Sequence, residues 1–186
     1  MLVGALSHSG RIRAAFSEGE DFAYLAAALD GILRRFGGTA RCWRTDRMAT
    51  VVAPGSGRLR PEAAELAKHY GVTVAVCPPR RAQRKGVVFE AAVGYLQRSW
   101  WRSAEAATTA QAQAGLDRWC VEVADRRRRR GLTVAERAAA EPLRPLPATA
   151  YPAELRAERV VSSSALVAFE GNRYSVPPAQ AGRPRP

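Results

Sequence analysis

Short β-forming runs and amphipathic helical segments alternate through the first hundred residues of this chain. The chain opens with a predicted hairpin, formed by residues 2–6 and 11–16 around a turn at Ser9-Gly10. A helix, a strand, a helix, a strand and two further helices are predicted to follow. Strand–helix–strand alternation is typical of a sheet covered by helices on both faces. The sequence therefore predicts an α/β fold with a mixed sheet in three layers.

Local signals set the expected boundaries of these elements. Ser17 is expected to open the first helix, because acidic residues follow it near the positive helix N-terminus, and Gly37-Gly38 is expected to end it. Pro61 suits the first turn of the next helix, and Gly71 suits its C-terminal cap. The other predicted elements are strands at 41–45 and 72–77 and helices at 61–70, 87–102 and 108–123.

The charge of the chain indicates a polyanionic partner. The formal net charge is +12 and the isoelectric point is near 10.9. Arginine supplies nearly all of the positive charge, since Lys68 and Lys85 are the only lysines. So positive a field attracts phosphate polymers or anionic membranes, although a GC-rich genome also raises arginine usage. We therefore expect DNA or RNA as the partner.

The cysteines and the apolar segments exclude several other classes of protein. Cys42, Cys77 and Cys120 are far apart and form no CxxC pair, which argues against a disulfide framework and a zinc knuckle. They are predicted to be reduced, buried thiols. No run approaches the ~18 apolar residues of a membrane span. The N-terminus has apolar residues before charged ones, the reverse of a signal peptide. We expect a cytoplasmic protein with no membrane partner.

The composition changes near residue 125. Five consecutive arginines occupy 126–130, and residues 131–157 are rich in Ala, Pro and Glu, which indicates a linker with some helical content. Two strands are predicted at 160–169 and 173–176, around a turn. A single hairpin is not stable alone, so both ends of the chain are expected to be incomplete. The predicted organisation is a core at 1–104, a helical Arg-rich linker at 105–157 and a small C-terminal domain at 158–186.

Two acidic residues occupy positions that suit metal-ion chemistry. Asp46 directly follows a predicted strand, and Glu90 lies near the start of a predicted helix. Hard oxygen ligands suit Mg²⁺ or Mn²⁺, which bind a few carboxylates and keep waters for substrate phosphates. Taken singly, an aspartate after a strand is more often a turn or cap residue, and a glutamate on a basic helix is more often a solvated ion-pair partner. The residues alone leave both interpretations open.

Several blocks of sequence, in order, carry a family resemblance over about residues 2–103. They resemble the catalytic core of IstA-type insertion-sequence transposases, which are DDE recombinases with a ribonuclease H-like fold, related to retroviral integrases. The blocks are Leu2–Ser7, Phe36–Gly38, Thr45–Val52, Ala67–Val72, Cys77–Arg81, Arg84–Val88 and Glu90–Tyr95.

The resemblance implies roles for the two acids. Asp46 matches the second acid of the metal-binding triad and Glu90 the third, although Glu90 falls one residue later than the spacing from Lys85-Gly86 expects. One residue is about 100° of helix rotation, so the helix start must adjust. The family's first acid belongs to a strand before the opening hairpin, so the first strand of the sheet is expected to be missing. The resemblance therefore implies that the chain is inactive alone.

The C-terminal segment carries a second, weaker resemblance. Residues 169–178, Phe-Glu-Gly-Asn-Arg-Tyr-Ser-Val-Pro-Pro, resemble the start of the small β-barrel that follows the core in these enzymes and in Mu-like transposases. The resemblance implies a DNA-binding or assembly domain that is truncated after its first hairpin.

Two basic segments are candidate DNA contacts. The loop after the second strand of the strand–helix–strand unit carries Arg80, Arg81, Arg84 and Lys85. These side chains are predicted to bind phosphates beside the metal site, without sequence preference, and a solvated loop is the alternative. Arg126, Arg127 and Arg128 have the same functional interpretation, with a solvated linker as the alternative. Trp100-Trp101 could stack on bases, but aromatic residues on a helix more often lie in the core.

The resemblance implies a parent enzyme that performs metal-dependent DNA strand cleavage and strand transfer. It also implies homo-oligomers on DNA, with transposon ends and target as substrates, and a separate ATPase helper. One alternative is a non-catalytic, basic nucleic-acid-binding remnant. Another is an Arg-rich RNA-binding protein unrelated to transposition.

Overall fold

The structure is a computed structural model that describes residues 1–77, 87–153, 160–169 and 172–177. The chain divides into two compact units, Met1–Ala153 and Glu154–Pro186. The first unit contains both predicted acids and most of the elements expected for the core. Each unit is described by itself below.

The predicted opening hairpin is confirmed. Strand β1 (Leu2–Ala5) pairs antiparallel with β2 (Ile12–Ala15), with Leu2 opposite Ala15 and Ala5 opposite Ile12. The turn closes through the Gly10 N–H, which donates to the Leu6 carbonyl over 2.9 Å. Gly10 has φ of +74°, a left-handed conformation that a glycine adopts without steric cost.

Helix α1 (Phe22–Phe36) begins later than the sequence predicts. Ser17 does not open it, because the Ser17 hydroxyl donates to the Gly19 carbonyl over 2.6 Å and so holds a local turn. Asp21 is the N-cap residue instead. The predicted end is confirmed, since Gly37 has φ of +83° and its N–H donates to the carbonyls of Leu33 and Arg34.

A parallel strand pair carries the next part of the chain. Strands β3 (Cys42–Thr45) and β4 (Thr73–Val76) pair in parallel and are joined through α2 (Pro61–His69), which has Pro61 at its start as predicted. Thr45 lies opposite Val76, so both strands end at the same edge. Buried side chains of α2, among them Leu66, pack into one cluster with α1 and β4.

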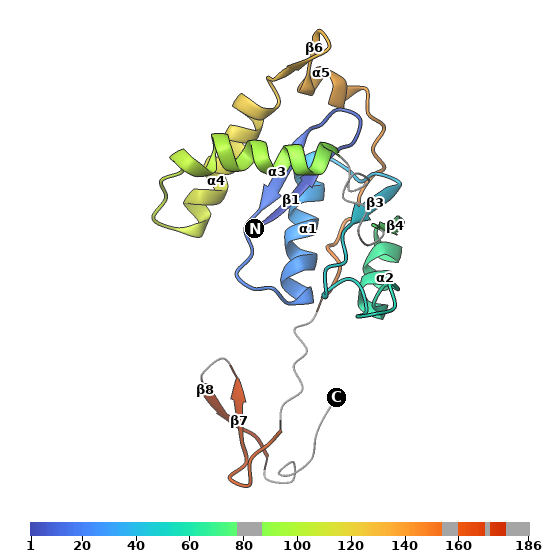
Figure 1. Ribbon diagram of the computed structural model, residues 1–186. Helices are drawn as coiled ribbons and strands as arrows, with labels where there is room; N and C mark the ends of the chain where they lie inside the picture. The colour runs from blue at the N-terminus through green and yellow to red at the C-terminus, as the bar shows by residue number, and fades with distance from the viewer. Residues whose placement is uncertain (78–86, 154–159, 170–171, 178–186) are drawn as a thin grey trace. The chain divides into compact units, whose positions relative to one another are not determined.

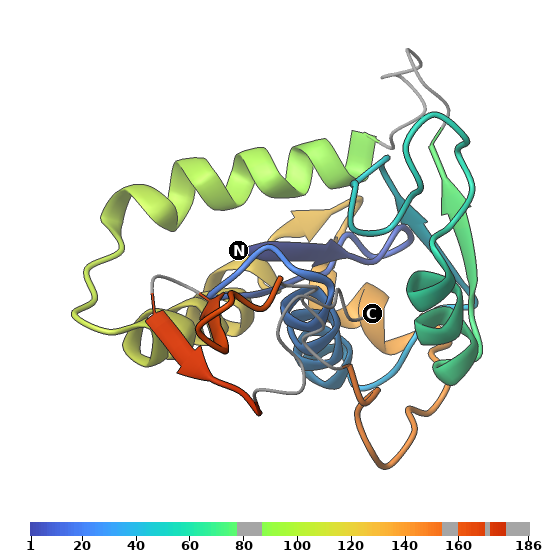
Figure 2. The same ribbon diagram turned by 90° about the horizontal axis from the view of Figure 1, so that it is seen from below.

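Helices cover both faces of the β1–β2 hairpin (Figures 1 and 2). Ala15 packs with buried residues of α1, whereas Ile12 and Ala14 pack on the opposite side. That opposite side is covered by α3 (Val87–Ser99), α4 (Thr109–Trp119) and a π-helical segment (Cys120–Ala124). The alternating side chains of the strand therefore produce the three-layer arrangement that was predicted. The buried members of the larger cluster are Ile12, Ala14, Ala92, Leu96, Trp100, Leu116, Trp119, Cys120 and Ala124.

The strands differ in one respect from the single mixed sheet that was expected. Within the described ranges, β1–β2 and β3–β4 are separate two-stranded sheets with no hydrogen-bonded pairing between them. The architecture is nevertheless mixed, because the described part of the first unit contains antiparallel pairs, β1–β2 among them, as well as the parallel β3–β4 pair.

Residues 105–153 belong to the first unit rather than standing apart from it. Helix α4 is tied to β2 through Gln113, whose side chain accepts from the Phe16 N–H and donates to the Ala14 carbonyl. The extended segment after α5 (Val134–Ala139) bridges to the end of α1, because Thr39 and Arg144 exchange backbone hydrogen bonds. The compact units divide at 153/154, whereas the boundaries predicted from the sequence at 104/105 and 157/158 stay predictions.

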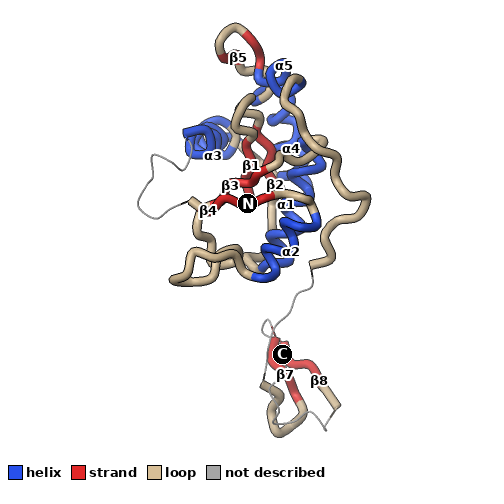
Figure 3. The backbone as a smooth tube through the Cα atoms, turned by 90° about the vertical axis from the view of Figure 1, so that its right-hand side faces the viewer, coloured by secondary structure: helices blue, strands red, loops and turns tan. Residues whose placement is uncertain are grey.

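The second unit contains the predicted C-terminal hairpin. Strand β7 (Leu166–Phe169) pairs antiparallel with β8 (Asn172–Ser175), with Val167 opposite Tyr174. Figure 3 shows these two strands in red. In the described part of this unit the pair is a two-stranded sheet, and further barrel strands stay a prediction.

Searched over the described residues, the helices are all too short or too polar to span a membrane. Of the three cysteines, Cys77 and Cys120 are buried as predicted. Cys42 is exposed instead, because its side chain points away from the core on the β3–β4 pair.

Stability is expected to fall above pH 9, because two buried groups are held neutral. Burial, and then a hydrogen bond donated to Asp30, raise the pKa of Tyr70 from 10.0 to about 12. Burial raises the pKa of the Cys120 thiol from 9.0 to about 11. Both groups lose their protons at lower pH in the unfolded chain than in the folded one. Folding is therefore favoured fully below pH 9 and progressively less up to pH 12.

Urea unfolding between pH 8 and pH 11 tests this expectation. As the pH rises from the unfolded to the folded pKa of each group, the free energy of unfolding should fall by up to about 1.4 kcal/mol per pH unit. Tyr70→Phe should flatten the curve above pH 10. An unchanged slope in that variant would contradict the role given to Tyr70.

Candidate catalytic and nucleic-acid-binding site

Asp46 lies at the carboxyl end of the parallel strand pair. It directly follows Thr45, the last residue of β3, and its side chain is exposed. The Cys77 N–H donates to the Thr45 carbonyl over 2.9 Å, so the ends of β3 and β4 are held together immediately before Asp46. The carboxylate is therefore presented to solvent from a fixed sheet edge, where α/β folds commonly place functional groups.

The loop after Asp46 is internally hydrogen bonded. The N–H groups of Val51 and Val52 both donate to the Met48 carbonyl, and Val52 forms an isolated bridge with Leu59. The Arg60 Nε donates to the Ala49 carbonyl over 2.6 Å. These contacts close the loop onto itself, so the backbone on both sides of Asp46 is constrained.

Glu90 lies in the first turn of α3 and is exposed. The same helix buries Ala92 and Leu96, which follow Glu90 by two and six residues. At about 100° of rotation per residue, these positions lie some 160° and 120° from Glu90 around the helix. The carboxylate therefore points away from the core, and the one-residue offset in the sequence does not bury it.

The two carboxylates belong to neighbouring elements of the first unit. Figures 1 and 3 show the N-terminal end of α3 beside the β3–β4 pair. No group of three or more His, Cys, Asp and Glu side chains suited to a metal ion occurs among the described residues. Two exposed hard-oxygen ligands nevertheless fit the donor chemistry of Mg²⁺ or Mn²⁺, which bind through one or two carboxylates and retain waters.

A surface hollow of about 360 Å³ opens beside the loop that follows Asp46. Residues 48–50 of that loop form one wall, and Leu25 and Ala28 of α1 form another. Met1 and Leu2, together with the turn at Ser17, Gly19 and Glu20, line the rest of it. The hollow places solvent-accessible space next to the sheet edge that carries Asp46.

The structure describes one of the two predicted basic segments. Arg80, Arg81, Arg84 and Lys85 lie outside the described residues. Arg126 and Arg128 are exposed, as a binding role requires. Arg127 is half-buried and packs 4.1 Å above the ring of Tyr95, while its guanidinium donates to the carbonyls of Ala124 and Gly10. Burial lowers the pKa of Arg127.

The two neighbouring tryptophans differ in burial. Trp100 is 7% exposed and lies in the core, whereas Trp101 is 54% exposed. The ring of Trp101 lies 5.9 Å from that of Trp100 and 6.4 Å from that of Phe16. His69 is the last residue of α2, and its ring lies 3.1 Å from the Thr149 carbonyl.

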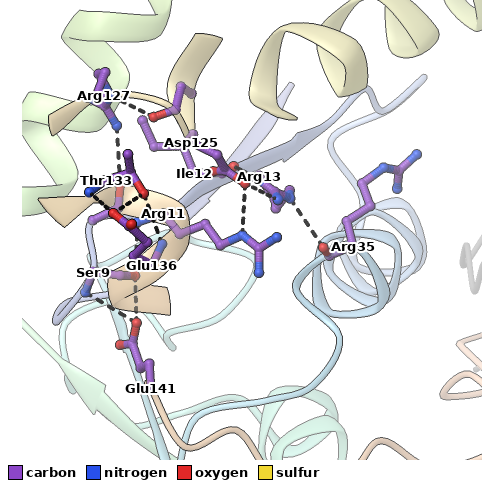
Figure 4. A network of polar contacts seen from close by, with 12 residues as sticks. Ser9, Arg11, Ile12, Arg13, Arg35, Asp125, Arg127, Thr133, Glu136 and Glu141 are labelled. Atoms are coloured by element: carbon purple, nitrogen blue, oxygen red, sulfur yellow. Dashed lines mark hydrogen bonds and ion pairs between the residues drawn. The ribbon is translucent and has the colours of Figure 1, made fainter. Parts of the chain in front are cut away.

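Sequence patterns missed the polar network that joins the opening hairpin to the arginine run (Figure 4). Asp125 accepts two hydrogen bonds from Arg13, at 2.7 and 3.1 Å, and one from Arg11 at 3.1 Å. Arg13 and Asp125 are 3% and 4% exposed. The one available signal was an arginine on a strand whose other residues are apolar.

Most of the chain is similar in sequence to known proteins. Residues 146–184 match a family described as the C-terminal domain of Mu transposase. Over 98% of its length the chain is 32% identical to the transposase for insertion sequence element IS21 of Pseudomonas aeruginosa. It is also 28% identical, over the same share, to a putative transposase for element IS5376 of Geobacillus stearothermophilus. The chain is thus similar to insertion-sequence transposases over nearly its whole length.

The chain spans about half the length of these two proteins, 48% and 47% respectively. Solved structures show its fold. The catalytic core domain of BIV integrase superposes with a TM-score of 0.54 at 20% identity, over 74% of this chain and 84% of that one. A chain of a simian T-cell lymphotropic virus intasome complex superposes with a TM-score of 0.56 at 14% identity, over 84% and 54%. The predicted ribonuclease H-like fold is therefore confirmed.

Proposed function

We propose that this protein acts on DNA as part of a transposase, in metal-dependent strand cleavage and strand transfer. The observation that carries the proposal is the combination of two exposed carboxylates, at the end of β3 and the start of α3, with transposase similarity over nearly the whole chain. Asp46 and Glu90 are proposed as two of the metal ligands. A magnesium or manganese ion held there would activate the attacking oxygen and stabilise the leaving oxygen of a phosphodiester.

The residues of this chain have positioning roles in that chemistry. The parallel strand ends fix the backbone of Asp46, and the buried face of α3 fixes the direction of Glu90. Arg80, Arg81, Arg84 and Lys85 are proposed to bind the phosphates that flank the scissile bond. Such contacts orient a substrate without reading its sequence.

We further propose the partners and the organisation of the active assembly. The DNA partners are transposon ends and target, and the protein assembles on them as a homo-oligomer with an ATPase helper. The segment that follows the core, together with residues 158–186, is proposed to contribute to DNA binding or assembly. The chain alone is proposed to be inactive, because the described residues bring no third carboxylate to Asp46 and Glu90.

The test uses the chain and the longest polypeptide that the gene locus encodes around it. With Mg²⁺ or Mn²⁺, the longer polypeptide should nick duplex DNA, and Asp46→Asn or Glu90→Gln should each abolish nicking. Glu65→Gln, which removes an exposed carboxylate from α2, is the matched control and should retain it. Persistence of nicking in both site variants would disprove the assignment.

A non-catalytic role in nucleic-acid binding is the second candidate, and the net charge of +12 favours it. That role predicts salt-dependent DNA binding with no cleavage under any divalent metal, in the longer polypeptide as well as in the chain.

A further inference from the structure

Residues 126–133 form a short hairpin that we call the arginine hairpin. Strand β5 (Arg128–Arg129) pairs antiparallel with β6 (Leu132–Thr133) around a two-residue turn. Both turn residues have positive φ, 52° for Arg130 and 86° for Gly131. Such a turn matches the twist of the flanking strands. Figures 1 and 3 show the hairpin extending beyond the helices of the first unit.

The base of the arginine hairpin is fixed to the core by polar contacts (Figure 4). Asp125, directly before it, is buried against Arg11 and Arg13. Arg127 packs on Tyr95 and donates to the Gly10 carbonyl. At its C-terminal end, Thr133 forms a reciprocal capping box with Glu136 at the start of α5. The hairpin is therefore held in one orientation before any partner binds.

Three acids near the arginine hairpin are held by hydrogen bonds of their own, whereas Glu122, four residues before Arg126, is exposed. Asp125 pairs with the opening hairpin, Glu136 is held by Thr133, and Glu141 accepts from the Ser9 hydroxyl over 2.6 Å. Hydrogen bonds from Thr133 lower the pKa of Glu136, so it stays ionised in the cap. In the described part of the chain, no ion pair involves Arg126, Arg128, Arg129 or Arg130.

The exposed arginines of the hairpin differ in the contacts that their side chains make. The guanidinium of Arg129 lies over the opening turn, where a Cβ added to Gly10 would meet its Nη1 at 2.6 Å. In the described part of the chain, the Arg128 side chain donates a hydrogen bond to the Gly131 carbonyl within its own hairpin, and its charge contributes to lowering the pKa of Glu136. Arg130 stands at the tip. An arginine in the left-handed region is strained where asparagine or glycine is not, and such strain is often associated with function.

We propose that the arginine hairpin binds the phosphate backbone of duplex DNA, through Arg128 and Arg130, and that Arg127 is an anchor that does not contact DNA. The proposal rests on the proposed function for the choice of DNA. A two-stranded ribbon is narrow enough to enter the major groove, and guanidinium groups bind phosphate oxygens in pairs. Because the base of the hairpin is already ordered, binding costs little additional conformational entropy.

The experiment measures binding of the full chain to a random-sequence duplex by fluorescence anisotropy, between 50 and 200 mM salt. The variant Arg128→Gln/Arg130→Asn removes two charges and relieves the strained turn. The slope of log affinity against log salt should become shallower by about 1.8, or 0.9 per lost phosphate contact. The ratio between the affinities of the unmodified chain and the variant should therefore be about tenfold smaller at 200 mM than at 50 mM salt. The melting temperature should not fall.

Two control variants separate binding from folding and from net charge. Arg102→Gln/Arg118→Gln removes two exposed charges from other elements and should leave the slope unchanged. Arg127→Gln should lower the melting temperature and leave the slope unchanged once the protein is folded. An equal slope change in the Arg102/Arg118 variant, or no change in the Arg128/Arg130 variant, would overturn the proposal.

The outcomes also distinguish this proposal from the proposed function. If the Arg128/Arg130 variant binds duplex DNA normally while nicking by the longer polypeptide still depends on Asp46 and Glu90, only the arginine hairpin proposal fails. If nicking fails but the hairpin variant shows the shallower slope, only the proposed catalytic function fails. A loss of affinity for RNA of equal length, with duplex binding intact, also overturns the hairpin proposal.

Discussion

Asp125→Asn is expected to lower the free energy of unfolding by about 3–5 kcal/mol. The substitution preserves shape but removes the charge that Arg13 needs, and Arg13 is 3% exposed. Arg13 donates to Asp125 through both terminal nitrogens, and its Nε donates to the Arg35 carbonyl (Figure 4). An uncompensated guanidinium would remain in the core, where desolvation is costly. The melting temperature should fall by roughly 10 °C.

A surface pair in the same protein supplies the control. Asp117 accepts from Arg35 Nε over 2.8 Å, but the two side chains are 38% and 31% exposed. Asp117→Asn should therefore cost at most about 1 kcal/mol. Urea unfolding of the two variants compares the same chemical change in a buried and an exposed pair.

The double variant Arg13→Met/Asp125→Leu tests whether the unpaired charge of Arg13 causes the loss of stability. Replacing both charges by apolar side chains removes the unpaired charge as well as the pair, and should recover most of the lost stability. Equal destabilisation by Asp125→Asn and Asp117→Asn would show that the Arg13–Asp125 pair is not desolvated in solution.

Local signals were sufficient where a single segment decides the structure. Gly10 and Gly37 adopt the left-handed conformations that their turn and cap positions require, and Pro61 begins α2. The start of α1 was missed because the Ser17 hydroxyl bonds within its own turn rather than to the helix. Both outcomes depend on hydrogen bonds between residues close in sequence.

Contacts between distant residues could not be predicted in the same way. Arg13 and Asp125 are 112 residues apart, and no periodicity relates them. The helical spacing of residues 108–123 indicates an apolar face but not the surface that covers it. That surface is Ile12 and Ala14 of the opening hairpin, so the helix joins the core.

The candidate sites also combine features that the sequence predicts with features that depend on contacts between distant residues. Family resemblance selected Asp46 and Glu90, and the structure exposes both from fixed elements. The arginine run is uniform in sequence, yet Arg127 is half-buried on Tyr95 while Arg128 is exposed. Burial within such a run depends on its neighbours in space, so identical residues acquire different roles only after folding.

Trp119→Ala is expected to destabilise the protein by about 3–5 kcal/mol. Trp119 ends α4, is 9% exposed and lies 5.4 Å from the ring of Tyr95, within the same cluster as Leu96 and Leu116. Removing the indole deletes the ring contact between α4 and Tyr95 of α3 and leaves a cavity that close-packed neighbours fill only in part.

The matched control is Trp101→Ala, which removes the same side chain from a position that is 54% exposed. It should cost no more than about 1 kcal/mol, because its aromatic contacts are at the surface. If residues 105–123 were a linker attached loosely to the core, both substitutions would have the same small effect on the urea midpoint. A large difference between them therefore establishes α4 as part of the folding unit that supports Glu90 on α3, and only such a unit would hold that carboxylate in a fixed position.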